Sequence, residues 1–322
     1  MKHTKSFWLI MALIVLASLL VACGQSEPET ITVGIINRVP PLDPVVEGFK
    51  AKMAEQGYVE GENITYIYEG AITDQAQLAP YTQKLVDADV DLIFGITTQA
   101  ATAAQQATSD IPIIFAPVNN PVEAGLVKDL TQPGGNVTGI TNAGGDPRRL
   151  QWLLEIDPTI KRVFIPYNSN DVAPSTAFAS LGKPAAALGI ELVPAEVHSA
   201  EENVQAIANI PDDVDAIFLL PDDVIITHIK EWVDAANQKQ LPISTPNTFP
   251  GSLMSFTFDS FTMGQQAARL ADQVLKGANA GDLPVENAEF FLTINLGTAE
   301  AIGLEIPDAV LEQANTLIRG NE

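Results

Sequence analysis

The chain of 322 residues has very few cysteines, histidines and basic residues. Its single cysteine is Cys23, so the part that follows can form no internal disulfide and must depend on a buried core. Lysine and arginine together number 17 against 40 aspartates and glutamates, which gives a formal net charge of −23. No basic cluster interrupts this negative field, which excludes nucleic acid as a partner and opposes binding to anionic lipid surfaces.

Recognisable catalytic motifs are also missing. The sequence contains no G-x-S-x-G elbow, no H-E-x-x-H helix and no glycine-rich phosphate loop. His198 and His228 are the only histidines beyond residue 22, and no nucleophile or set of metal ligands accompanies either of them. We therefore expect both histidines to be structural or solvated, and we expect no enzyme activity, no metal ion and no cofactor.

The N-terminal segment has the pattern of an export signal. Two lysines precede an unbroken apolar run over residues 7–20, and the stretch Leu20-Val21-Ala22-Cys23 resembles the lipobox of bacterial lipoproteins. A transmembrane helix is the alternative, but the run is shorter than the roughly 20 residues of a membrane span and no stop-transfer charges follow. We expect residues 1–22 to be a lipoprotein signal peptide, with a lipid on Cys23 anchoring the protein to the outer side of the cytoplasmic membrane and 23–30 as a tether.

After residue 30, short apolar runs alternate with amphipathic stretches. Continuous apolar runs predict strands that are buried on both faces, and strict alternation with helices is typical of a parallel sheet with helices on both sides. In the first half of the chain the expected strands are 31–36, 63–68, 91–96 and 111–115, and the expected helices are 44–56, 75–88 and 99–108.

The same pattern restarts after Gly144 and Gly145. The expected helices are 147–156, 174–188, 201–208 and 224–238, and the expected strands are 162–166, 190–194, 216–220 and 241–244. An apolar run at 253–258, a long helix at 261–277, a run at 289–296 and a helical tail follow. The repetition predicts two doubly wound parallel-sheet lobes with a cleft between them.

Polar loops follow the strands, at the sheet edge where open parallel sheets bind ligands. Thr97, Thr98 and Gln99 come directly after the strand 91–96 and open a helix, which suits an anion such as a carboxylate, although plain N-capping explains the threonines equally well. Asn119 and Asn120 end the next strand, where an asparagine before proline is also an ordinary turn signal.

The second half offers acidic and amide side chains in equivalent loops. Asn168 follows the strand 162–166, and Asp222 follows 216–220, where a carboxylate can hold an ammonium group or cap the next helix. Asp259 ends an apolar run beside Phe258 and Phe261. It is a candidate for the cationic end of a ligand, with N-capping again as the alternative.

Several motifs, in this order and spacing, resemble the ABC-transporter substrate-binding family typified by tryptophan- and tyrosine-binding lipoproteins. The resemblance covers nearly the whole chain after the signal segment, and no single motif decides it. The matching stretches are Gly57-Tyr58-Val59-Glu60-Gly61-Glu62-Asn63, residues 91–98, Asn120-Pro121 with 124–127, 133–139, 216–218 with Pro221-Asp222, 264–268, 275–277 and Asn295-Leu296 through 303–304.

The resemblance implies a type I periplasmic-binding-protein fold, whose two lobes close about a hinge on a small solute and present it to an ABC permease. We expect the first lobe to comprise 31–141 plus about 256–284, and the second 142–255 plus about 285–322. The positions that match the family's cleft or hinge are Thr97, Thr98, Asn119 or Asn120, Thr141 and Asn142, with Asn168, Asp222 and Asp259 across the cleft.

An amino acid, with an aromatic one favoured, is the ligand that the resemblance implies. Two departures from the family's pattern bear on it: Val39 stands where members often have histidine, and Ser260 stands directly after Asp259, where an aromatic residue is common. A sensory lipoprotein that binds the same solute and signals to a membrane partner is the alternative function. The lipobox, and the absence of a helix-turn-helix segment before residue 31, exclude a DNA-binding regulator.

Overall fold

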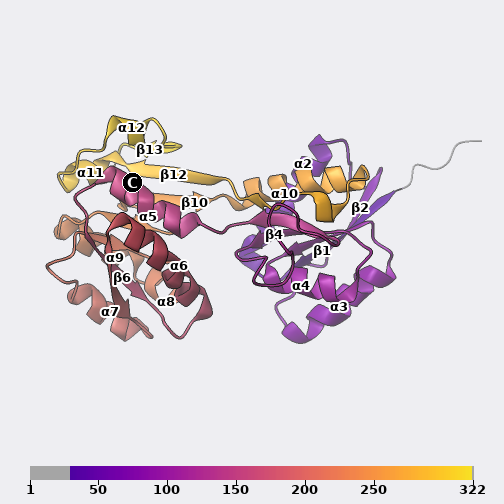
Figure 1. Ribbon diagram of the computed structural model, residues 1–322, viewed down its shortest axis with the longest axis horizontal. Coiled ribbons are helices and arrows are strands. Elements are labelled where there is room, and N and C mark those ends of the chain that lie inside the picture. Colours follow the sequence, from indigo (N-terminus) through magenta and orange to yellow (C-terminus); the bar gives the residue numbers. More distant parts are fainter. Residues whose placement is uncertain (1–29, 321–322) are drawn as a thin grey trace, which may run out of the picture.

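The computed structural model describes residues 30–320; the signal segment, Cys23 and the tether up to residue 29 lie outside the described residues. The described chain forms two lobes that lie side by side along the long axis of the molecule (Figure 1). Each lobe is a sheet with helices on both faces, which confirms the predicted α/β class with two doubly wound lobes. None of the helices within residues 30–320 is both long enough and apolar enough to cross a bilayer.

The first lobe has a six-stranded sheet in the order β11-β5-β4-β3-β1-β2, with every neighbouring pair parallel. Its strands are β1 (Ile31–Asn37), β2 (Ile64–Ile67), β3 (Leu92–Ile96), β4 (Ile113–Val118), β5 (Val137–Thr141) and β11 (Glu286–Asn287). Its helices are η1 (Pro40–Leu42), α2 (Asp43–Glu55), α3 (Gln75–Asp87), α4 (Thr98–Ala107), α10 (Ser260–Leu275) and η2 (Ala280–Asp282).

Two helices that are far apart in sequence, α2 and α10, cover one face of this sheet together. Phe49 of α2 stacks on Phe94 of β3 with ring centroids 4.4 Å apart. The helix backbones touch at Gly264, where a Cβ would lie 2.0 Å from the Val45 carbonyl oxygen. Because no side chain fits there, glycine sets the distance between the two helices. The other face of the sheet is covered by α3 and α4.

The second lobe has a seven-stranded sheet in the order β13-β12-β10-β9-β8-β6-β7. Its strands are β6 (Arg162–Tyr167), β7 (Glu191–Glu196), β8 (Ala216–Phe218), β9 (Ile243–Thr245), β10 (Met254–Phe258), β12 (Phe290–Asn295) and β13 (Thr316–Ile318). Its helices are α5 (Gly145–Ile156), α6 (Val172–Leu188), α7 (Ala200–Ala208), α8 (Asp223–Ile226), α9 (Ile229–Gln238), α11 (Leu296–Ala301) and α12 (Asp308–Leu311). One core cluster lies on each face of the sheet.

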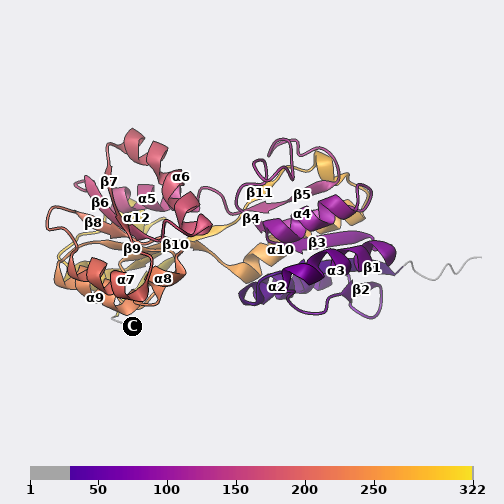
Figure 2. The same ribbon diagram turned by 90° about the horizontal axis from the view of Figure 1, so that it is seen from below.

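The described chain crosses between the lobes three times (Figures 1 and 2). The first crossing joins β5 to α5, the second joins β10 to α10 at Asp259, and the third joins β11 to β12 at residues 288–289. The second crossing lies a few residues after the expected boundary near 256, because β10 belongs to the second sheet up to Phe258. The third crossing lies a few residues after the expected boundary near 285, because β11 still pairs with the first sheet.

Local structure differs from the expectations in the second half of the chain. The helix expected over 224–238 is divided into α8 and α9, because the Asn203 side-chain amide donates to the carbonyl oxygens of Val224 (2.7 Å) and Ile225 (3.3 Å) and so occupies acceptors of the helix ladder. The seven-stranded sheet of the second lobe is also not wholly parallel as expected, because β10 and β12 pair antiparallel. The tail, expected to be helical, ends in β13, which pairs with β12.

Candidate functional site

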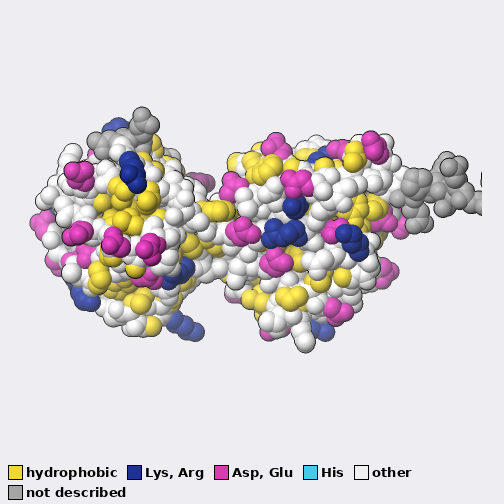
Figure 3. Space-filling view, turned by 90° about the horizontal axis from the view of Figure 1, so that it is seen from above, with side chains coloured by type: hydrophobic (Ala, Val, Ile, Leu, Met, Phe, Trp, Pro, Cys, Tyr) yellow, Lys and Arg dark blue, Asp and Glu magenta, His cyan; other side chains and the backbone are white. Residues whose placement is uncertain are grey.

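A cleft of about 950 Å³ lies between the lobes. The first lobe lines it with residues that follow β1, β3, β4 and β5, and the second lobe with the N-terminal turns of α5 and α6 and with β10 and β12. Figure 3 shows the narrow waist between the lobes, with hydrophobic side chains on it and acidic side chains spread over both lobes. The predicted cleft at the carboxyl ends of the strands is therefore present in the structure.

Four polar residues stand in a row along the first-lobe edge of the cleft. Arg38 and Thr97 each follow a residue of the registered pair Asn37–Ile96, on the neighbouring strands β1 and β3. Asn119 and Asn142 follow the registered pair at the ends of β4 and β5. Since β5, β4, β3 and β1 are consecutive in the sheet, these side chains succeed one another at strand spacings of about 4.8 Å.

Three of these four residues carry buried polar atoms that have no hydrogen-bond partner: Nε and Nη1 of Arg38, Oγ1 of Thr97 and Oδ1 of Asn142. Thr97 also has φ 87° and ψ 160°, a backbone conformation that is costly for a β-branched residue. Unsatisfied buried polar atoms cost about 1–3 kcal/mol each, and more if charged. They lie in the cleft, where a polar ligand can satisfy them.

Three phenylalanines form an aromatic wall at the waist of the cleft. Phe256 and Phe290 stack with ring centroids 5.0 Å apart and an interplanar angle of 15°, and Phe258 meets Phe290 edge-on at 6.0 Å. All three are half-buried and belong to the paired strands β10 and β12. Because Gly145 lies so close that a Cβ would come within 2.6 Å of the Phe290 ring, the wall reaches the first turn of α5.

A buried arginine fixes the second-lobe wall beneath α5. Arg149 is fully buried, and its Nη2 donates to Asp146 Oδ1 (2.7 Å) and to the Leu219 carbonyl oxygen (2.8 Å). Its guanidinium lies 3.8 Å above the centre of the Phe218 ring. Burial lowers the pKa of Arg149, and the attraction of Asp146 opposes that shift. Asp146, which lines the cleft, is thereby held in place by a charge that water does not reach.

Six of the predicted site residues line the cleft: Thr97, Thr98, Gln99, Asn119, Asn120 and Asn142. Thr97 occupies the N-cap position of α4, but its hydroxyl makes no capping bond, so the capping alternative fails for that side chain. Thr141 lies directly beneath the row. Its hydroxyl donates to the Asn119 carbonyl oxygen (3.0 Å) and so supports the loop rather than facing the cleft.

The predicted site residues of the second lobe and its crossing do not line the cleft. Asp222 is buried and accepts hydrogen bonds from the backbone N–H groups of Val224 (2.9 Å), Ile225 (3.3 Å) and Asn168 (2.6 Å). Asp259 is exposed in the second crossing and caps α10 by accepting from the Thr262 N–H (2.7 Å). The capping interpretation describes both carboxylates, so we do not place them in the candidate site.

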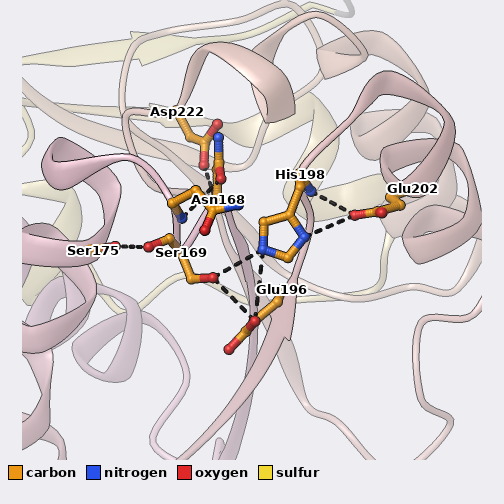
Figure 4. Close-up of polar contacts among 8 residues, drawn as sticks. Asn168, Ser169, Ser175, Glu196, His198, Glu202 and Asp222 are labelled. Atoms are coloured by element: carbon orange, nitrogen blue, oxygen red, sulfur yellow. Dashed lines mark hydrogen bonds and ion pairs between the residues drawn. The ribbon is translucent and has the colours of Figure 1, made fainter.

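Figure 4 shows how Asn168 is fixed beside a histidine network. His198 lies with Nε2 3.0 Å from the Ser169 hydroxyl and Nδ1 3.1 Å from Glu202. The His198 backbone N–H also donates to Glu202 (2.7 Å), and this bond lowers the pKa of the Glu202 carboxyl. The network ties the loop after β6 to the start of α7, which is the structural role expected for His198.

Sequence reasoning missed Arg38, Asp146 and the aromatic wall. Arg38 follows β1 in the same way that Thr97 follows β3, so its place after a predicted strand was the available signal. Phe290 lay inside a predicted apolar run, but nothing in the sequence shows that its strand pairs antiparallel with β10 and so stacks its ring on Phe256.

Comparison with known proteins agrees with this architecture. The family described as ABC transporter substrate binding protein matches residues 30–318. The chain belongs to this family of substrate-binding proteins. The tyrosine-binding protein of Clostridioides difficile is 30% identical to this substrate-binding protein over 323 residues, covering 94% of each chain.

Two solved structures are similar over the described lobes of this substrate-binding protein. A ligand-free, open structure of a substrate-binding protein with adhesive properties from Clostridium difficile has a TM-score of 0.78 at 26% identity, covering 91% of this chain and all of the other. An ABC domain in complex with L-Trp from Streptococcus pneumoniae has a TM-score of 0.69 at 29% identity, covering 90% of this chain and all of the other. More distant structures, at 13–15% identity with TM-scores of 0.55–0.57, share the type I periplasmic-binding-protein fold.

Proposed function

We propose that this substrate-binding protein is an extracytoplasmic, lipid-anchored receptor that binds an aromatic amino acid and delivers it to an ABC permease. The observation that carries the proposal is the pairing, in one cleft, of a polar row with unsatisfied atoms and a wall of three phenylalanines. Polar atoms suit the backbone end of an amino acid, and stacked rings suit an aromatic side chain. Relatives that bind tyrosine and L-Trp support this choice of ligand.

Closure about the three crossings is the proposed mechanism. The TM-score is higher against the open, ligand-free relative than against the L-Trp complex, which supports an open form for the described lobes. Ligand bound to the first-lobe row would draw the second-lobe wall over it, and the closed form is what a permease would recognise. A ligand shifts this equilibrium only by its difference in affinity for the two forms, so contacts from both lobes are needed.

Calorimetry of the purified chain that begins after residue 22 tests the ligand class. The panel is L-tyrosine, L-tryptophan, L-phenylalanine, L-leucine and D-ribose, with small-angle scattering to follow closure. We expect binding of at least one aromatic amino acid, a smaller radius of gyration on binding, and the same ligand recovered unchanged after release. Binding of leucine or ribose with none of the aromatic amino acids would refute the proposal.

The anchor is tested separately through Cys23. We expect Cys23→Ser to abolish lipid attachment, so that the protein is soluble or retained only by an uncleaved signal segment. Metabolic labelling with a fatty acid and membrane fractionation measure this. A processed, lipid-bearing Cys23→Ser protein in the membrane fraction would show that the anchor lies elsewhere, without bearing on the ligand.

A further inference from the structure

We infer that Arg38 recognises the carboxylate of the ligand and restricts the cleft to solutes with a free carboxylate. The inference rests on the proposed function for the rest of the ligand, and it assigns the residue that directly follows β1. Arg38 is the only lysine or arginine among the described residues that line the cleft.

The acidic residues of the cleft do not neutralise Arg38. Glu123 accepts from the Asn120 amide, Asp146 pairs with Arg149, and Asp171 caps α6 by accepting from the Ala173 N–H. No ion pair links Arg38 to any carboxylate of residues 30–320. A chain with 40 acidic residues therefore keeps one cation of its cleft unpaired.

The buried atoms of Arg38 are costly to leave without a hydrogen-bond partner. Its Nε and Nη1 are shielded from solvent and have no hydrogen-bond partner, while the residue as a whole is half-buried and lines the cleft. A guanidinium in such surroundings is stabilised by an anion with planar acceptors, and a carboxylate has that shape. A neutral hydroxyl or amide would leave the charge uncompensated.

The neighbours of Arg38 favour the same ligand group. Thr97, adjacent across the β1–β3 pair, adds an unsatisfied hydroxyl and begins a helix of 10 residues whose positive end faces the cleft. Asn142 stands at the other end of the row, three strand spacings or about 14 Å from Arg38, so it is too far to contact the same end of an amino acid. Arg38 and Thr97 together therefore form the carboxylate end of the row.

The test compares L-tryptophan with L-tryptophanamide, which keeps the ring and the ammonium but lacks the carboxylate, and repeats the comparison with tyrosine and its amide. The variants are Arg38→Met, which keeps the apolar stem, and Arg38→Lys, which keeps the charge but not the planar fork. Arg269→Met, an exposed arginine of α10 outside the cleft, is the matched control. Circular dichroism and thermal melting confirm that each variant folds.

We expect wild type to bind the amino acid about 10- to 100-fold more tightly than its amide, the range for one lost charge-assisted hydrogen bond. Arg38→Met should lose a similar factor for the amino acid and bind the two compounds equally, Arg38→Lys should keep part of the preference, and Arg269→Met should match wild type. Equal wild-type affinities for acid and amide would overturn the inference even if Arg38→Met failed to fold.

The outcomes also separate this inference from the proposed function. If wild type binds an aromatic amino acid and Arg38→Met binds it as tightly, the inference is wrong and the proposed function stands. If no aromatic amino acid binds but another carboxylate, such as L-leucine or benzoate, binds and loses affinity in Arg38→Met, the inference stands and the proposed ligand is wrong.

Discussion

Replacing Arg149 by methionine should destabilise the second lobe strongly. The substitution removes three hydrogen bonds, to Asp146 (2.7 Å), to the Leu219 carbonyl oxygen (2.8 Å) and to the Ser244 hydroxyl (3.3 Å), and it removes the contact with the Phe218 ring. Methionine fills most of the space, so the loss comes from polar groups left without a partner.

The expected loss follows from burial of the pair. Breaking a buried ion pair by removing one partner costs about 3–5 kcal/mol, because the other charge stays behind uncompensated. The Asp146 side chain keeps 21% of its exposure, so water relieves part of that cost. We therefore expect the free energy of unfolding of the second lobe to fall by about 3 kcal/mol, the lower end of that range.

Urea denaturation followed by tryptophan fluorescence isolates this lobe, since Trp152 and Trp232, the only tryptophans beyond residue 22, both belong to it. The matched control is Arg148→Met, the preceding residue, which is half-buried, pairs with Glu155 and stacks on the Trp152 ring at 4.1 Å, so the baseline fluorescence of this variant is normalised separately. The control should change stability by less than about 1 kcal/mol. Equal midpoints for the two variants would refute the assignment of Arg149 as the central polar anchor of the lobe.

Three further predictions concern the first lobe and the crossings. Gly264→Ala should lower the free energy of unfolding of the first lobe, measured by hydrogen exchange, by about 1–3 kcal/mol, because the new Cβ would lie 2.0 Å from a carbonyl oxygen of α2. The control Gly182→Ala, which has open space around it in α6, should not lower the stability of either lobe. Asp259→Asn should leave ligand affinity unchanged, because asparagine caps a helix as well as aspartate does. A loss of affinity of about tenfold would instead show that Asp259 contacts the ligand. Burial raises the pKa of Tyr58 to about 12, and raises those of three other first-lobe tyrosines, so stability should hold below pH 10 and fall as pH rises toward 12. Tyrosinate absorbance rising before tryptophan fluorescence changes would confirm that the first lobe opens first; the reverse order would contradict it.

Much of the fold could be predicted because many of the buried strands are continuous apolar runs. β3, for example, is buried at all five positions and reads as apolar in the sequence. β5 is also buried at all five positions, but it contains two threonines and a glycine and was not among the strands expected from the sequence. The two-residue strand β11 and the three-residue strand β13 carry no such signal, since pairing with a neighbour defines them. The division between α8 and α9 depends on Asn203, about 20 residues away, and periodicity within a helix does not register such a contact.

The candidate site was predicted unevenly for a physical reason. A carboxylate before a helix can cap it or face a ligand, and both uses have the same sequence pattern; in the structure Asp222 and Asp259 each cap a helix. The predicted loops of the first lobe line the cleft because the ends of parallel strands meet at one edge of the sheet. Arg38 escaped notice because an arginine after a strand usually lies in solvent, and its unsatisfied atoms become visible only when burial is known.

The packing of α10 on α2 has a consequence for biosynthesis. The apolar face of α2, with Val45, Val46, Phe49 and Met53, is covered by a helix that leaves the ribosome about 200 residues later. Until then the N-terminal lobe lacks both α10 and its edge strand β11, and cannot close its core. The first lobe of the nascent chain therefore cannot complete its core until α10 and β11 have been synthesised, near the end of translation.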